Sequence, residues 1–181
     1  LCNPLDPYGC SKVMCETLIK TYHNTYGIKY VIIRSGNVFG PGQGLGLFIP
    51  SVIRKINEGN GIIFTGSLES RRNFVYISDI VNAYSMCIKN KKSENQIFNV
   101  MSYNKKMSDI ATEISKNAKK ILNKHIVFKV EEKLSRASST ESSFFVMDCS
   151  KIQKILGWKP SLSFSEAICK TFEDYTKNDA K

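Results

Sequence analysis

The sequence predicts an α/β fold whose strands are mainly parallel. Short β-branched runs, such as KYVIIR at residues 29–34 and QIFNV at residues 96–100, alternate with longer segments of helical periodicity. A composition of 42% hydrophobic and 10% aromatic residues is typical of a globular domain. Alternation of this kind favours buried parallel strands joined by helical crossovers.

The first predicted helix covers residues 7–26. Asp6 is its expected N-cap, Pro7 takes the first helical position, and Gly27 follows the last turn. The strand at residues 29–34 comes next, followed by a glycine-rich loop at residues 35–46.

The rest of the chain continues the alternation. Ser78 or Asp79 is expected to cap a helix that ends near residue 89, and we assign Asp79 to this capping role. Trp158 lies between the helix-ending Gly157 and Pro160, and is expected to pack two helices together. The other expected elements are helices at 48–57, 108–122, 150–156 and 163–177, strands at 61–66, 73–77, 96–100 and 125–130, and a serine-rich loop at 134–143.

Composition narrows the class of protein. The formal net charge is +10, but the lysines are scattered along helical stretches, which is typical of a solvated face rather than a nucleic-acid surface. The six cysteines form no CxxC pair and suggest neither a zinc site nor another metal site, so we expect free thiols and a cytoplasmic location. No apolar run approaches the ~20 residues that a membrane helix requires.

Tyr8 and Lys12 form the first candidate for catalysis. Four residues apart on a helix, the phenol and the ammonium lie on one face. A cation within ~6 Å favours the phenolate, and the amino end of a helix acts in the same direction, so Tyr8 would suit proton transfer from a hydroxyl. Alternatively, the two side chains only pack against each other.

Five motifs, in order, give the chain a family resemblance. PLDPYGCSK resembles the Tyr-x-x-x-Lys segment of the extended short-chain dehydrogenase/reductases, specifically the NAD-dependent nucleotide-sugar epimerases and dehydratases. The others are IIRSGNVFGPGQ at 32–43, LFIPSVIRK at 47–55, RRNFVYISDIVNA at 71–83 and DCSKIQKILGWKP at 148–160. The resemblance implies the C-terminal part of a Rossmann-like NAD(P)-binding fold plus a small α/β substrate-binding lobe.

The resemblance also implies roles for the first pair. Tyr8 would be the acid/base at the sugar 4-hydroxyl while hydride passes between C4 and NAD, with NADP the less favoured cofactor. Lys12 would hold the nicotinamide ribose. PYGCSK at residues 7–12 resembles epimerases and decarboxylases more than the Tyr-Ser-Ala-Ser-Lys run of 4,6-dehydratases. An epimerase is therefore the leading expectation; a dehydratase, a decarboxylase and a non-catalytic binding module are the alternatives.

Nucleotide-sugar binding is implied for a second group of residues. Asn37 matches an amide that contacts the substrate diphosphate, although Asn also suits a turn. Arg72 matches a diphosphate-binding arginine, Arg136 is the second candidate in a less certain register, and Arg71 is expected to be solvated. Four further residues match the nucleotide base and ribose pocket or, equally, belong to the core: Leu47, Phe48, Phe64 and Thr65.

A glycine-rich dinucleotide loop is not found in the sequence. The glycines at 40, 42, 44 and 46 do not fit GxGxxG, because Leu45 and Leu47 occupy the required positions. We therefore expect a C-terminal portion, with residues 1–45 ending the Rossmann domain and 46–181 mainly forming the substrate lobe. Such a portion would be inactive alone, and the full-length protein is expected to be a homodimer through the first helix and the helix after Ser78.

Overall fold

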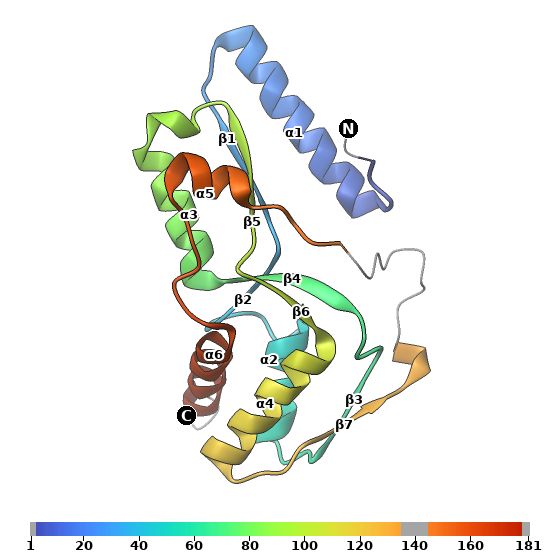
Figure 1. Cartoon of the computed structure of the whole chain (residues 1–181). Coiled ribbons are helices and arrows are strands. Elements are labelled where there is room, and N and C mark those ends of the chain that lie inside the picture. Colours follow the sequence, from blue (N-terminus) through green and yellow to red (C-terminus); the bar gives the residue numbers. More distant parts are fainter. Residues whose placement is uncertain (1–2, 135–144, 179–181) are drawn as a thin grey trace.

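The computed structural model describes residues 3–134 and 145–178. Figure 1 shows the chain divided into an upper and a lower part. The upper part holds the strands β1 (Val31–Ser35) and β5 (Gln96–Val100) with the helices α1 (Pro7–Tyr26), α3 (Ile77–Lys89) and α5 (Ser150–Leu156). The remaining strands and helices form the lower part.

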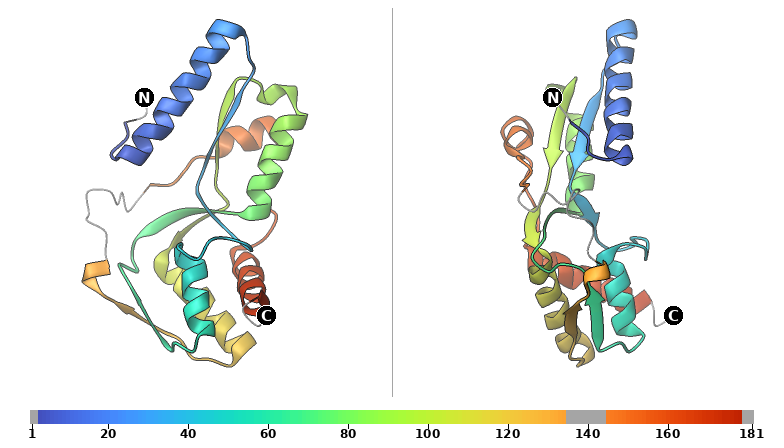
Figure 2. Two further views of the ribbon diagram at one scale, coloured as in Figure 1. Left: turned by 180° about the vertical axis from the view of Figure 1, so that it is seen from behind. Right: turned by 90° about the vertical axis from the view of Figure 1, so that its right-hand side faces the viewer.

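In the upper part, β1 and β5 pair in parallel, with Val31 opposite Gln96. Helix α5 lies on one side of this pair and α1 on the other (Figure 2). A cluster of buried side chains joins α3, α5 and β5, and Trp158 is 1% exposed within it. The packing role expected for Trp158 is confirmed.

The lower part contains a three-stranded sheet and a two-stranded pair. In the sheet, β4 (Arg71–Tyr76) lies between β2 (Asn37–Phe39), which is parallel to it, and β6 (Tyr103–Lys106), which is antiparallel. The pair consists of the parallel strands β3 (Ile62–Thr65) and β7 (Val127–Val130). Two short 3₁₀ turns, Lys91–Ser93 and Glu132–Leu134, complete the described chain together with the helices α2 (Phe48–Asn57), α4 (Met107–Leu122) and α6 (Phe164–Asn178).

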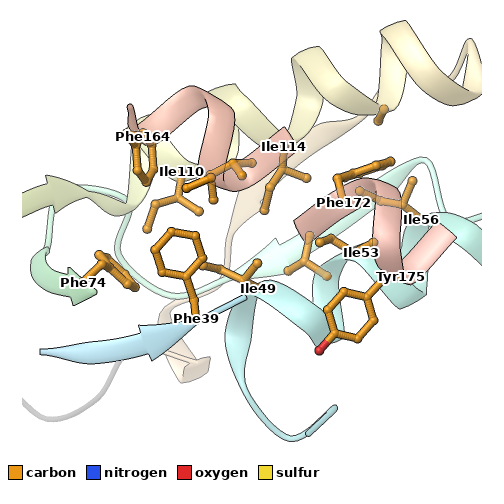
Figure 3. Close-up of a cluster of buried hydrophobic side chains, with 14 of the residues drawn as sticks. Phe39, Ile49, Ile53, Ile56, Phe74, Ile110, Ile114, Phe164, Phe172 and Tyr175 are labelled. Carbon is orange, nitrogen blue, oxygen red and sulfur yellow. The ribbon is translucent and has the colours of Figure 1, made fainter. Parts of the chain in front are cut away.

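The lower core is built from the apolar faces of the three helices and the aromatic side chains of the sheet. Figure 3 shows Phe39 and Phe74 meeting Ile49, Ile110 and Phe164 at one end of this cluster. The ring centroids of Phe39 and Phe74 lie 6.0 Å apart in an edge-to-face arrangement, which is favourable for aromatic pairs. This core holds α2, α4 and α6 against the strands that carry the site described below.

Most expected elements are confirmed, and the mainly parallel α/β class is correct. Helix α1 has the predicted bounds: the Asp6 carboxylate accepts a hydrogen bond from the Gly9 amide at 2.6 Å, and Gly27 has a φ of 70°. Two strands escaped prediction: β2 lies within the expected glycine-rich loop, and β6 has a polar sequence. Apart from Leu134, the loop expected at 134–143 lies outside the described residues.

Asp79 does not cap α3, contrary to the expectation from sequence. The helix begins at Ile77, and no side-chain hydrogen bond caps it. The Asp79 carboxylate is 1% exposed and accepts hydrogen bonds from the Ser102 hydroxyl at 2.6 Å and from the Ser161 amide and hydroxyl at 2.9 and 2.6 Å. Its carbonyl accepts from Trp158 Nε1 at 3.0 Å. Asp79 therefore clamps three distant segments together.

Candidate functional site

A large cleft of about 490 Å³ opens in the lower part of the molecule. Its volume is within the usual range for small-molecule sites. The cleft brings together five residues singled out from the sequence: Asn37, Leu47, Phe48, Thr65 and Arg72. The first and the last of these residues are 35 positions apart in sequence, and the fold collects all five around one space.

Different elements position these side chains. Asn37 begins β2 and is paired in register with Phe74 of β4, which places it beside Arg72. Thr65 ends β3, whereas Leu47 and Phe48 lie at the amino end of α2. The cleft therefore has a polar end at β2 and β4 and an apolar end at α2.

The polar end is suited to an anion. Arg72 brings a guanidinium group, and Asn37 brings an amide whose side chain has no hydrogen-bond partner among residues 3–134 and 145–178. Asn37 lies in a strand, so the alternative that it serves a turn is not supported. None of the described residues that line the cleft carries a carboxylate.

A small cavity of about 220 Å³ adjoins the large cleft and shares Asn37 and Arg72 with it. Arg71 and Asn73 of β4 form part of its wall. The other described lining residues are Ser35, Gly36, Phe145 and Met147. The arginine and the amide are thus lining residues that the two spaces share.

Gly36 permits the close approach of β4 to the end of β1. A Cβ atom at this position would lie 2.8 Å from the Asn73 carbonyl oxygen, which is shorter than side chains tolerate. The Gly36 amide also donates to the Val100 carbonyl at 2.9 Å. This glycine therefore allows the end of β1 and strand β4 to meet at the wall of the small cavity.

Tyr8 and Lys12 lie on α1, outside the described lining of both spaces. The Lys12 ammonium is 5.0 Å from the Tyr8 ring centroid, so the two groups share a face as the spacing predicts. The Tyr8 side chain is 71% exposed. The amino end of α1 points down toward the part of the molecule where β1 ends (Figure 1). Ser35, the last residue of β1, lines the small cavity.

A single bidentate ion pair ties the middle of α1 to β1. The Arg34 guanidinium donates two hydrogen bonds of 2.6 Å to the Glu16 carboxylate. The Arg34 guanidinium holds the pKa of Glu16 below its ordinary value, although partial burial opposes that shift. No side chain of α1, all of whose residues the structure describes, is buried.

Two residues predicted to bind the nucleotide sugar are not among the described residues that line the cleft. Phe64 is 53% exposed and does not line the cleft, because successive residues of a strand face opposite sides and Thr65 faces the cleft. Arg136 lies outside the described residues.

Several lining residues were not anticipated from the sequence. Gln43 donates from Nε2 to the Val38 carbonyl at 2.5 Å and so shapes the loop beside the cleft. Gly66 and Ser67 directly follow β3, and small polar residues at the carboxyl end of a parallel strand were an available signal. Met107 closes another side of the cleft.

The resolved pKa shifts belong to structural groups outside the two spaces. Burial, reinforced by nearby Asp79, raises the pKa of Tyr103 to about 12, and its hydroxyl donates to the Leu162 carbonyl at 2.7 Å. Burial also raises the pKa of Cys149, which disfavours a reactive thiolate. Within the described chain, no group of three or more His, Cys, Asp or Glu residues could hold a metal ion.

One group of the chain has the chemistry to contact a dinucleotide. Lys12 offers a cationic donor for ribose hydroxyls, and the parallel pair β1–β5 is of Rossmann type. The sequence contains no GxGxxG or GxxGxxG loop to hold a pyrophosphate.

Comparison with known proteins identifies the family. The profile of the GDP-mannose 4,6-dehydratase family matches residues 1–171. The chain belongs to this family. Its relatives are NAD-dependent sugar dehydratases and epimerases of the extended short-chain dehydrogenase/reductase class, as the sequence motifs predicted.

The relatives include both a dehydratase and a putative epimerase. The chain is 33% identical to a putative UDP-glucose 4-epimerase of Methanocaldococcus jannaschii, covering 98% of the chain and 55% of that protein. It is 31% identical to mouse dTDP-D-glucose 4,6-dehydratase, covering 97% and 49%. The chain thus spans about half the length of the curated relatives it matches.

A solved structure of the family shows the same fold. UDP-glucuronic acid 4-epimerase from Bacillus cereus, in complex with UDP-glucuronic acid and NAD, superposes with a TM-score of 0.82 at 25% identity. The match covers 98% of this chain and 55% of the epimerase. Within residues 3–134 and 145–178, no helix has the length and apolar character needed to cross a bilayer.

Proposed function

We propose that this chain is the substrate-binding portion of an NAD-dependent nucleotide-sugar epimerase. The observation that carries the proposal is the large cleft, which gathers an apolar end around Leu47 and Phe48 and an anion-binding end around Asn37 and Arg72. A nucleoside diphosphate has this same division into a flat apolar base and two charged phosphates. Amide and guanidinium groups are suitable donors to phosphate oxygens.

In this proposal Tyr8 and Lys12 act at the sugar end of the substrate. Tyr8 would take the proton of the sugar 4-hydroxyl, and Lys12 would hold the ribose next to the nicotinamide and favour the phenolate. NAD, when bound, supplies the acceptor for the hydride at C4. Return of the hydride to the opposite face of the 4-keto sugar would invert that centre.

A 4,6-dehydratase is the second candidate, because the matching family profile and the mouse relative carry that name. Both activities begin with the same oxidation at C4, so the cleft supports either one. The intact protein, incubated with UDP-, dTDP-, CDP- and GDP-sugars, distinguishes them by product mass. Loss of one water identifies a dehydratase, and an isomer of unchanged mass identifies an epimerase.

The role of Tyr8 has its own test in the intact protein. Tyr8→Phe keeps the ring but removes the proton carrier, so kcat should fall by about 10²–10⁴-fold. Tyr22→Phe, on the same helix, is the matched control and should leave kcat unchanged. Near-normal kcat in Tyr8→Phe would refute the assigned role.

The cleft itself can be tested on this chain by calorimetry. A nucleoside diphosphate should bind, and Arg72→Gln should weaken binding about tenfold or more, because hydrogen bonds to charged groups are among the stronger ones. Arg54→Gln is the control: Arg54 lies on α2, where its Nε pairs with Glu58 at 2.7 Å. If none of UDP, dTDP, CDP and GDP binds at millimolar concentration, the proposal fails.

A homodimer is proposed for the intact protein. Helix α1 exposes Met14, Leu18 and Tyr22, and α3 exposes Val81, Tyr84 and Ile88. Large apolar side chains gathered on two helices are typical of surfaces that another element covers. Sedimentation analysis of the intact protein, with Leu18→Glu as the disrupting variant, tests this assembly.

A further inference from the structure

We infer that the small cavity receives the sugar and that Arg71 selects a sugar carrying a carboxylate group. The inference deepens the proposed function and rests on it, since the diphosphate must lie beside Asn37 and Arg72, which line both spaces. The sequence suggested that Arg71 is merely solvated, but its side chain is half-buried and lines the cavity.

The order of the substrate's parts follows from the residues that the two spaces share. Leu47 and Phe48 form the apolar end of the large cleft, where a base would lie. Asn37 and Arg72 line both spaces, so the diphosphate lies between them. The group bonded to the far phosphate, which is the sugar, then enters the small cavity on the side toward which α1 points.

Neutral amides fix the orientation of Arg71. Its Nη1 donates to the Asn104 Oδ1 atom at 2.9 Å, and Asn104 Nδ2 donates to Asn73 Oδ1 at 2.9 Å. Asn73 Nδ2 in turn donates to the Phe145 carbonyl at 3.1 Å. Asn73 and Asn104 are register partners on β4 and β6, so this network joins two strands and the segment at 145–147. The guanidinium is held in place while most of its five N–H groups stay available to a ligand.

The charge of the small cavity favours an anionic sugar. Two adjacent arginines line it, and no carboxylate is present among its described lining residues. No ion pair joins Arg71 to an acidic residue of the described chain. Beside a neutral hexose, the charge of Arg71 would have no acidic partner among the described residues. A planar carboxylate accepts two parallel hydrogen bonds from a guanidinium group and removes this imbalance.

Calorimetry on this chain with UDP, UDP-glucose and UDP-glucuronate tests the inference, because the two sugars differ only at C6. We expect UDP-glucuronate to bind roughly tenfold to hundredfold tighter than UDP-glucose. Arg71→Gln should abolish that preference and leave the affinity for UDP unchanged. Arg71→Lys should restore part of the preference, since it keeps the charge but loses the planar fork. Lys106→Gln, next to the same network but paired with Glu69 at 2.7 Å, is the control.

The possible results separate the inference from the proposed function. Equal affinity for the two sugars, with normal UDP binding, overturns the selection by Arg71 and leaves the proposed function intact. If Arg71→Gln weakens the binding of UDP as much as the binding of UDP-glucuronate, Arg71 contacts the diphosphate rather than the sugar. That result also overturns the inference. Failure of UDP and of both sugars to bind overturns the inference together with a uridine-based form of the proposed function.

Discussion

Replacing Asp79 by alanine should lower the free energy of unfolding far more than the loss of a helix cap would. The carboxylate accepts three hydrogen bonds from Ser102 and Ser161, and each bond to a charged group contributes about 1.5–3 kcal/mol. Because the bonds share one side chain and do not add fully, we expect a loss of about 3–5 kcal/mol. A cap alone would cost only about 1 kcal/mol.

Urea denaturation measures this loss, and fluorescence of Trp158, the single tryptophan, reports it from the same buried cluster. Asp109→Ala is the matched control, since Asp109 also lies in the first turn of a helix and, among the residues that the structure describes, accepts a hydrogen bond only from the Lys106 amide, at 3.0 Å. Asp79→Asn retains the shape and should give an intermediate loss. A loss in Asp79→Ala no larger than in Asp109→Ala would refute the clamp.

Three further predictions concern α1, the wall of the small cavity and the cofactor. The folded-state pKa of Glu16 is lowered, so its pair with Arg34 stabilises the fold above the ordinary glutamate value of 4.5 and stops doing so as pH falls through the lowered pKa. In urea denaturation, the free energy of unfolding of the wild type should exceed that of Glu16→Gln by about 1 kcal/mol at pH 7, and the two values should be equal at acid pH. A difference that does not change with pH would contradict this expectation. Gly36→Ala should lower the free energy of unfolding by about 1–3 kcal/mol in the same assay and weaken nucleotide-sugar binding, because its Cβ would press on the Asn73 carbonyl. A variant that behaves like the wild type would exclude the close approach. Calorimetric titration of NAD into this chain should show no tight binding, since the sequence lacks a glycine-rich pyrophosphate loop, and saturable sub-millimolar binding would count against that expectation.

Elements whose boundaries depend on local chemistry were predictable from sequence. Asp6, Pro7 and Gly27 define α1 through capping and a positive φ, and Gly157 ends α5 in the same way with a φ of 70°. The resemblance then supplied the five residues that the large cleft unites. Conformational preferences within a few residues therefore predicted the ends of α1 and α5, whereas the family resemblance predicted the cleft residues.

Features that depend on distant partners were not predictable. Strand β6 reads as a polar segment, Tyr-Asn-Lys-Lys, and is a strand only because β4 pairs with it. Asp79 lies in a position typical of a cap, yet its partners come from residues 23 and 82 positions later in the chain. Arg71 looks solvated until Asn104, from the neighbouring strand, orients it.

The attachment of α1 has a consequence for reactivity. The helix that carries Tyr8 is joined to β1 by a short connection after Gly27 and is held at its middle by the ion pair of Glu16 with Arg34. Its amino end therefore lies more than two helical turns from that ion pair. A small rotation of α1 about this ion pair would displace the Tyr8 phenol without disturbing the lower core. The proposed proton transfer by Tyr8 and the proposed binding of substrate in the large cleft would therefore depend on parts of the structure that are held separately.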